Sequence, residues 1–69
     1  MSNHVYRLSE IVGSSPSSVD DAIRTGIAKA ARTVRNIEWF EVGQIRGQVV
    51  DGEVAHVQVA LKIGFRVDD

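Results

Sequence analysis

Three residues in this sequence have the chemistry to hold a flat, phosphorylated ligand. Trp39 is the only tryptophan, and an indole stacked on another ring contributes about 1 kcal/mol beyond the burial of its area. Gln58 carries an amide, which donates and accepts hydrogen bonds and therefore matches a ring edge bearing C=O and N–H groups. Arg46 carries a planar guanidinium, which can bind phosphate through two parallel hydrogen bonds.

Each of these residues also has an ordinary structural interpretation. Trp39 could fill the core, and Gln58 and Arg46 could be solvated residues of strands. A lone strand histidine such as His56 is more often a surface or interface group than a ligand. The glycines of the second half of the chain do not form a dinucleotide-binding motif, because no helix follows them.

The sequence predicts neither catalysis nor a metal site. It contains no cysteine, and its histidines are His4 and His56, so a thiol nucleophile and a structural zinc site are not expected. No serine shows a neighbouring pattern of histidine and carboxylate. We therefore expect a non-enzymatic binding protein with no catalytic residues.

Size points to self-association. The chain has 69 residues, with 43% hydrophobic and 25% charged residues, and residues 1–69 are predicted to form one domain. A compact chain of this mass exposes roughly 4,300 Å², against about 11,000 Å² when unfolded, so it buries only about 60% of its surface. Without disulfides, oligomerisation is the common route to stability for so small a domain.

Charge and hydropathy exclude other partners. Eight Lys and Arg residues nearly balance nine Asp and Glu residues, for a net charge of −1, whereas nucleic-acid-binding domains usually carry a basic face. No apolar run approaches the length of a membrane span, and the N-terminal residues lack a signal-peptide pattern. A cytoplasmic protein that binds neither nucleic acid nor membrane is expected.

The first half of the chain predicts a strand, a loop and a helix. Residues 5–12 read as a short strand, and residues 13–18 as a loop. From Val19 to Val34 apolar residues recur at helical spacing, and Asn36 is the expected stop. Two N-terminal capping registers are open, in which either Ser17 or Ser18 is the cap, with an aspartate three residues later in each case.

The second half predicts a long hairpin. Residues 37–50 and 53–67 are strand candidates, and the Asp51-Gly52 pair between them is typical of a two-residue type I′ turn. The second of these strands alternates strictly, and its odd-numbered residues should meet the helix. They are Ala55, Val57, Val59, Leu61, Ile63, Phe65 and Val67.

These elements predict an α+β fold of order β-α-β-β, in which a single helix covers one face of a three-stranded antiparallel sheet. The hairpin turn sets a register with Trp39 opposite Gly64 and Ile45 opposite Gln58, so Trp39 and Gln58 project from the uncovered face. That register would place Arg46 on the helix side. Two alternatives are open: a bulge at Gly43 or Gly47 reverses its direction, or the strand tip extends past the helix into water.

Over essentially its whole length, the sequence resembles the dodecins. The resemblance rests on Val5-Tyr6-Arg7, the segment Glu10–Ser15, Trp39-Phe40-Glu41-Val42, Ile45-Arg46-Gly47, the Asp51-Gly52 turn and the segment Val57–Arg66. Dodecins are small flavin-binding proteins that assemble as hollow dodecamers with their helices outside and their sheets facing inward. The resemblance therefore implies a homododecamer in which sister chains cover the second face of the sheet.

The resemblance also implies roles for the three residues. Trp39 matches the tryptophan that stacks on the isoalloxazine ring, and Gln58 matches the glutamine that hydrogen-bonds the edge of that ring. Arg46 matches an arginine that bacterial members use near the flavin phosphate, which favours FMN over riboflavin; FAD is a further candidate. Gln44 stands where archaeal members have an aspartate that binds the ligand tail. Some bacterial relatives also bind coenzyme A.

The function implied is FMN storage and sequestration, with photoprotection through quenching by the stacked indole. Two other interpretations stay open: a subunit of a flavoenzyme, and an assembly module that binds coenzyme A. Access to the flavin distinguishes the first, since a ring enclosed between aromatic groups leaves little room for a substrate.

Overall fold

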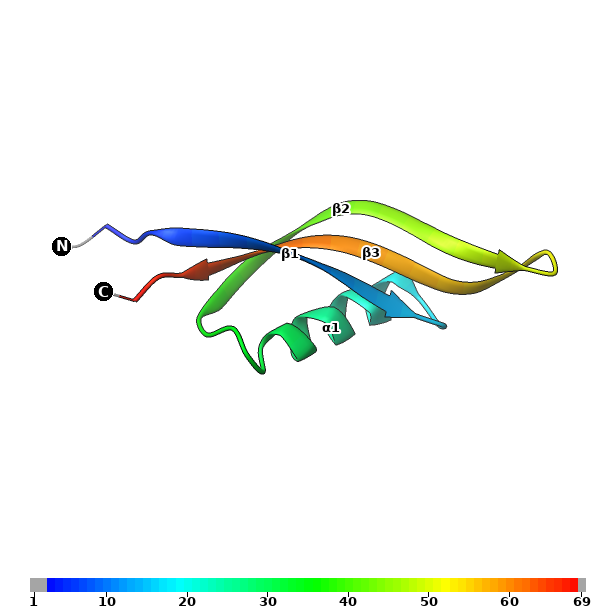
Figure 1. Ribbon diagram of the computed structural model, residues 1–69, viewed down its shortest axis with the longest axis horizontal. Helices are drawn as coiled ribbons and strands as arrows, with labels where there is room; N and C mark the ends of the chain where they lie inside the picture. The colour runs from blue at the N-terminus through cyan, green and yellow to red at the C-terminus, as the bar shows by residue number, and fades with distance from the viewer. Residues whose placement is uncertain (1–2, 69) are drawn as a thin grey trace.

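The computed structural model describes residues 3–68; Met1, Ser2 and Asp69 of the expected single domain lie outside the described residues. Four elements follow one another: β1 (Tyr6–Ser15), α1 (Val19–Ala30), β2 (Ile37–Val50) and β3 (Glu53–Arg66). The strands form one antiparallel sheet of order β1-β3-β2. Figure 1 shows α1 against one side of this sheet. The predicted α+β fold is therefore confirmed.

The helix covers only part of the sheet. It packs against β1 and β3, and the far end of the β2–β3 hairpin extends beyond it (Figure 1). Ala22 of the helix and Val59, Leu61 and Ile63 of β3 are fully buried. The odd-numbered face of β3 thus meets the helix at its centre, as its alternation predicts, while Ala55 and Val57 nearer the tip are only partly covered.

Strand β1 is longer than the sequence predicts, because Gly13, Ser14 and Ser15 continue its pairing with β3. A Cβ atom built on Gly13 would overlap the backbone carbonyl of Ala22, and one built on Gly26 would lie 3.3 Å from the Cα atom of Gly13. Two glycines therefore let the helix backbone lie directly on the strand. The sequence predicted a loop at residues 13–15 because local turn residues do not report this contact between the strand and the helix.

The helix begins at one of the two predicted N-cap positions and ends earlier than its sequence pattern predicts. Ser18 is the N-cap, and its hydroxyl accepts a hydrogen bond of 3.0 Å from the amide of Asp21. The predicted continuation to Val34 is wrong, since α1 ends at Ala30. The amides of Arg32 and Thr33 bond three residues back rather than four, which tightens the chain as is common at helix ends.

The hairpin matches its prediction closely. Asp51 and Gly52 both have positive φ, at 53° and 76°, as a type I′ turn requires. Strand β2 has the predicted bounds, and β3 ends one residue earlier than predicted.

The register of the hairpin changes along its length. Trp39 lies opposite Gly64, as predicted. Between Val42 and Ile45, however, β2 contains one more residue than the facing segment of β3, so Ile45 pairs with Val59 and not with Gln58. The predicted pairing of Ile45 is therefore wrong, and the alternative of a bulge at Gly43 is confirmed.

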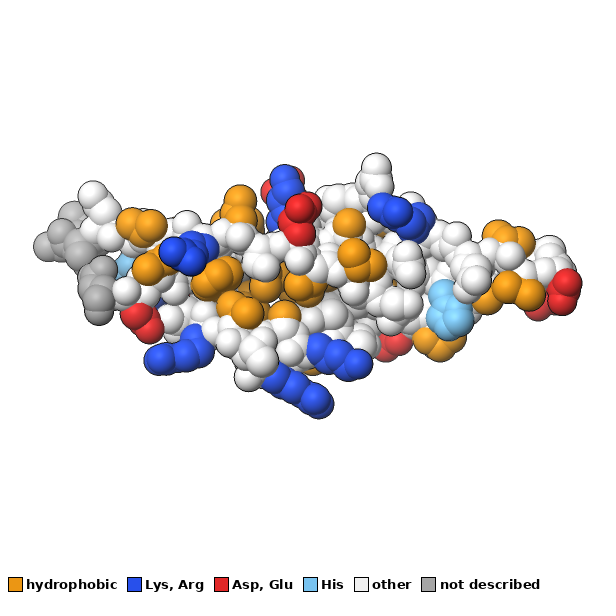
Figure 2. Space-filling model, in the orientation of Figure 1, with side chains coloured by type: hydrophobic (Ala, Val, Ile, Leu, Met, Phe, Trp, Pro, Cys, Tyr) orange, Lys and Arg blue, Asp and Glu red, His pale blue; other side chains and the backbone are white. Residues whose placement is uncertain are grey.

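The folded chain is elongated and underpacked for its mass. Its principal extents are 56 × 20 × 14 Å and its radius of gyration is 14.4 Å, whereas a compact chain of this length has a value of about 11 Å. It exposes 5279 Å², against roughly 4,300 Å² for a compact monomer. Apolar side chains reach the surface along the whole length of the view in Figure 2.

Candidate functional site

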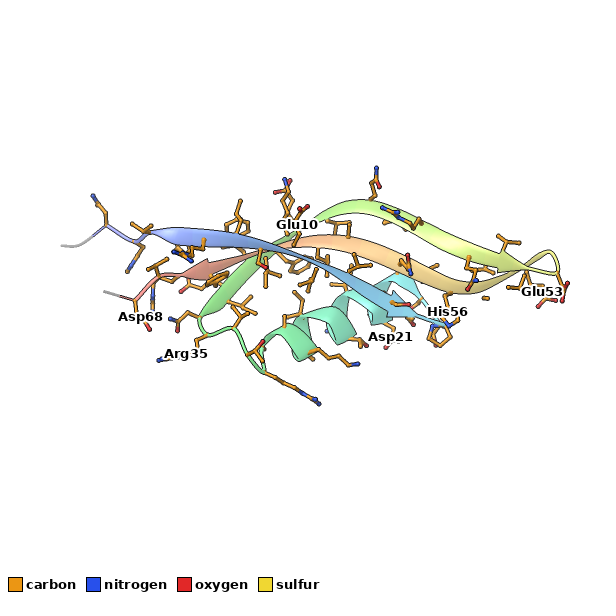
Figure 3. The ribbon with its side chains drawn as sticks, in the orientation of Figure 1. Glu10, Asp21, Arg35, Glu53, His56 and Asp68 are labelled. Atoms are coloured by element: carbon orange, nitrogen blue, oxygen red, sulfur yellow. The ribbon has the colours of Figure 1, made fainter. Side chains whose placement is uncertain are left out.

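The face of the sheet away from α1 carries all three candidate binding residues. The pairings of β3 with β1 and β2 show which residues lie on this face. Gly64 lies between Leu8 and Trp39, Lys62 between Glu10 and Glu41, and Gln58 between Ser14 and Arg46. In Figure 3, Glu10 points away from the helix. No segment of residues 3–68 covers this face, so its side chains are available to a ligand or to another chain.

Trp39 lies flat on the sheet rather than standing away from it. A Cβ atom built on Gly64 would fall within the indole ring, so the ring rests on the backbone of β3 where no side chain intervenes. The residue is 41% exposed. One face of the indole therefore contacts protein and leaves a flat aromatic surface open for stacking, which excludes the alternative that Trp39 fills the core.

The bulge at Gly43 brings Arg46 and Gln58 together. It turns the Arg46 side chain to the uncovered face, where its Cα is directly paired with that of Gln58. Both residues are exposed at a depression of about 520 Å³. The guanidinium also donates a 2.7 Å hydrogen bond to the side-chain oxygen of Gln44. Arg46 is thus beside Gln58 on the uncovered face.

The walls of this depression include residues that the sequence did not assign to the site. They are Ser14, Gly47, Gln48 and His56. His56 lies on the hairpin beyond the helix (Figure 3). Ser14 reaches the depression only because β1 extends to Ser15 and pairs with β3. The wall combines a cation, amides and a hydroxyl, which suits a polar or anionic group.

Trp39 is not adjacent to the Arg46–Gln58 pair within one chain. Gly64 and Gln58 are six positions apart on β3, which corresponds to about 20 Å along the strand. The sequence correctly placed Trp39 and Gln58 on one face, but the fold of a single chain separates them along it.

A second polar cluster lies beside Trp39. The Tyr6 hydroxyl donates a 3.1 Å hydrogen bond to Glu38 Oε1, and Arg66 Nη1 lies 3.3 Å from Glu38 Oε2. The hydrogen bond to Glu38 raises the pKa of the Tyr6 phenol above its ordinary value; desolvation and the carboxylate charge act in the same direction, and Arg66 opposes them. Sequence alternation alone could not find this cluster, because it joins all three strands.

The opposite side of the molecule has an apolar groove of about 410 Å³ between α1 and β2, lined by Ile23, Ile27, Ala28 and Phe40 with Asp20 and Arg24 at its rim. It contains none of the candidate binding residues, and Phe40 is 48% exposed there. We interpret it as a packing surface and place the ligand site on the other face.

Within residues 3–68 no group of three carboxylate or histidine side chains could hold a metal ion. Among the same residues, no helix has the length and apolar character that a bilayer span demands.

Comparison with known proteins gives a consistent result. The sequence profile described as Dodecin matches residues 5–68. A dodecin from Thermus thermophilus is 40% identical over 65 residues, which cover 94% of each chain. The solved dodecin from Streptomyces davaonensis is 56% identical with a TM-score of 0.95, over 99% of this chain and all of that one.

The structure of dodecin from Streptomyces coelicolor is 55% identical, again with a TM-score of 0.95, over 100% of this chain and 99% of the other. These relatives are named as dodecins, and none of their names gives an enzymatic activity. Together with the matching fold and order of elements, they show that this chain belongs to the dodecin family.

Proposed function

We propose that this protein binds FMN without catalysing a reaction and stores it inside a hollow homododecamer, where the indole of Trp39 protects the cell from the photoexcited ring. The observation that carries the proposal is the flat, open indole of Trp39 on an uncovered sheet face that also bears Arg46 and Gln58. Family membership supports it.

The residues present suit a flavin. Trp39 would stack on the isoalloxazine ring, Gln58 would hydrogen-bond the ring edge, and Arg46 would pair with the phosphate. When bound, the flavin supplies a light-absorbing ring whose excited state the touching indole quenches by donating an electron. Storage and quenching both follow from stacking, and neither needs an acid, a base or a metal.

Strand geometry favours a site shared between protomers. An isoalloxazine ring on Trp39 does not extend over the roughly 20 Å that separates Trp39 from Gln58 along β3. We therefore propose that Trp39 comes from one protomer and that Gln58 and Arg46 come from a neighbour. The elongated shape and the excess of exposed surface support such an assembly.

Two exposed apolar regions would supply the interfaces. One is the uncovered sheet face, and the other is the helix side of β2, where Phe40, Val42 and Ile45 are all more than one-third exposed. A monomeric soluble protein rarely leaves this much apolar surface to water. Neighbouring protomers that cover both regions would bury them and close the flavin site.

A fluorescence titration tests the proposal. FMN emission should fall as protein is added, and Trp39→Ala should weaken binding and restore emission from what remains bound. Emission that stays unquenched at saturating protein would exclude the stacked site. Turnover of reduced nicotinamide faster than free FMN supports would favour the flavoenzyme interpretation instead, and binding of coenzyme A without FMN would favour the assembly module.

Arg46→Ala separates the phosphate role from the ring role. A hydrogen bond to a charged group is worth about 1.5–3 kcal/mol, so FMN affinity should fall by about 10- to 150-fold. Riboflavin, which lacks the phosphate, should bind the variant and the wild type equally. An equal loss for both ligands would show that Arg46 does not contact the phosphate.

A further inference from the structure

Tyr6, Glu38 and Arg66 form a connected polar cluster against Trp39. The Tyr6 ring lies 6.5 Å from the Trp39 ring between centroids, at an interplanar angle of 58°. The Tyr6 hydroxyl donates to one oxygen of Glu38 at 3.1 Å, and Arg66 approaches the other at 3.3 Å. An oxidisable phenol therefore lies next to the one indole of the chain and already donates its proton in a hydrogen bond to a carboxylate.

We propose that Tyr6 and Glu38 form a redox relay that restores Trp39 after the indole has lost an electron. In the relay, Tyr6 gives one electron to the oxidised indole and Glu38 takes the phenolic proton. This inference goes beyond ligand storage, because it assigns an activity to side chains that lie outside the proposed binding set.

The step balances in charge and atoms. The Trp39 radical cation gains one electron from Tyr6 and becomes the neutral indole. Tyr6 loses that electron, and its O–H proton passes to Glu38 Oε1, which leaves a neutral phenoxyl radical and a protonated carboxyl. Under the proposed function, the oxidant that first removes an electron from Trp39 is the photoexcited isoalloxazine ring; any other one-electron oxidant of the indole starts the same relay.

The cluster is arranged for this direction of transfer. A phenol is protonated at neutral pH, and the Tyr6 hydroxyl already donates to Glu38, so the proton can leave along an existing hydrogen bond. Once the phenol loses an electron it becomes a strong acid, and even an ion-paired carboxylate accepts its proton. Arg66 engages only the second oxygen of Glu38, which leaves Oε1 to Tyr6.

Composition makes the relay measurable without any flavin. The sequence has one tryptophan and one tyrosine, so an indolyl radical reports Trp39 alone and a phenoxyl radical reports Tyr6 alone. Azide radicals produced by a radiolysis pulse oxidise indoles in preference to phenols. In the wild-type protein, the indolyl absorption should decay as the phenoxyl absorption rises, at a rate independent of protein concentration and slower in D₂O.

Three variants distinguish relay from structure. Tyr6→Phe keeps the ring and should lose the phenoxyl signal, with a longer-lived indolyl radical. Glu38→Gln keeps the hydrogen-bond acceptor but not the base, and should slow the transfer. Glu41→Gln removes a carboxylate on the same sheet face as Trp39, at a residue whose Cα is paired with that of Lys62, and should transfer at the wild-type rate.

Either of two results would overturn the proposal. One is a wild-type indolyl radical that decays with no phenoxyl signal, and the other is a Glu38→Gln variant that matches the wild type in both rate and isotope effect. Circular dichroism and light scattering would check that each variant folds and assembles. Because no flavin is present, the result is independent of the FMN titration, and either hypothesis can fail alone.

Discussion

Gly64→Ala is expected to disable the proposed ligand site without removing any group that would touch the ligand. The added methyl would occupy space that the Trp39 indole now fills, and the backbone of residue 64 fixes the direction in which the methyl points. The indole must therefore leave the sheet surface. Because Trp39 is 41% exposed, it can swing into solvent, and we expect a loss of folding stability of about 1 kcal/mol, at the low end for overpacking.

The effect on FMN should be larger than the effect on stability. Stacking of a flat base on an aromatic side chain is worth about 1–3 kcal/mol by substitution, which corresponds to a loss of about 5- to 150-fold in affinity. The assay is quenching of FMN fluorescence on titration, compared with the wild type. Urea denaturation of the same preparations would report the change in stability separately.

Gly43→Ala is the matched control. A Cβ atom there would lie 3.5 Å from the carbonyl oxygen of Ala60, an ordinary contact that displaces nothing. This variant should bind FMN as the wild type does. If Gly64→Ala also binds FMN with unchanged affinity while it remains folded and assembled, the position of Trp39 on Gly64 is irrelevant to binding and the stacking argument fails.

Three further outcomes are expected. Gly13→Ala should destabilise the fold by about 1–3 kcal/mol, since its methyl would meet the backbone of Ala22; urea midpoints close to the wild type would contradict the tight helix–strand contact. The raised Tyr6 pKa means that the folded state holds the phenolic proton more firmly than the unfolded state, so folding stability should fall as the pH rises through about 10 and beyond. Denaturant midpoints measured at alkaline pH should show this slope in the wild type. A Tyr6→Phe variant with the same slope would count against the Glu38 hydrogen bond. Stability should also rise with protomer concentration, and light scattering that finds a folded monomer at micromolar concentration would refute self-association.

Local pattern was sufficient for much of the fold. The strict alternation of β3 predicted its bounds to within one residue and the face that meets the helix, and the Asp51-Gly52 turn predicted the hairpin. The same pattern placed Trp39 opposite Gly64. These features depend on neighbours within a few residues, and the sequence gives the types of those neighbours directly.

Other features depend on contacts between distant segments. Ser14 and Ser15 extend β1 because Gln58 and Val57 pair with them. Tyr6 reaches Glu38 and Arg66 because β3 lies between β1 and β2. No periodicity within one segment encodes the order of strands, and so the polar cluster beside Trp39 was not predicted.

The residue types and the alternation of the strands, which are set by local chemistry, determined that an indole, an amide and a guanidinium lie in one hairpin and that the first two share a face. Only the tertiary structure decided where Arg46 points, because the extra residue between Val42 and Ile45 reverses the side chains that directly follow it, and whether such a bulge forms depends on how β2 pairs with β3. The fold likewise set the distance between Trp39 and Gln58, because a formed strand has a fixed rise per residue.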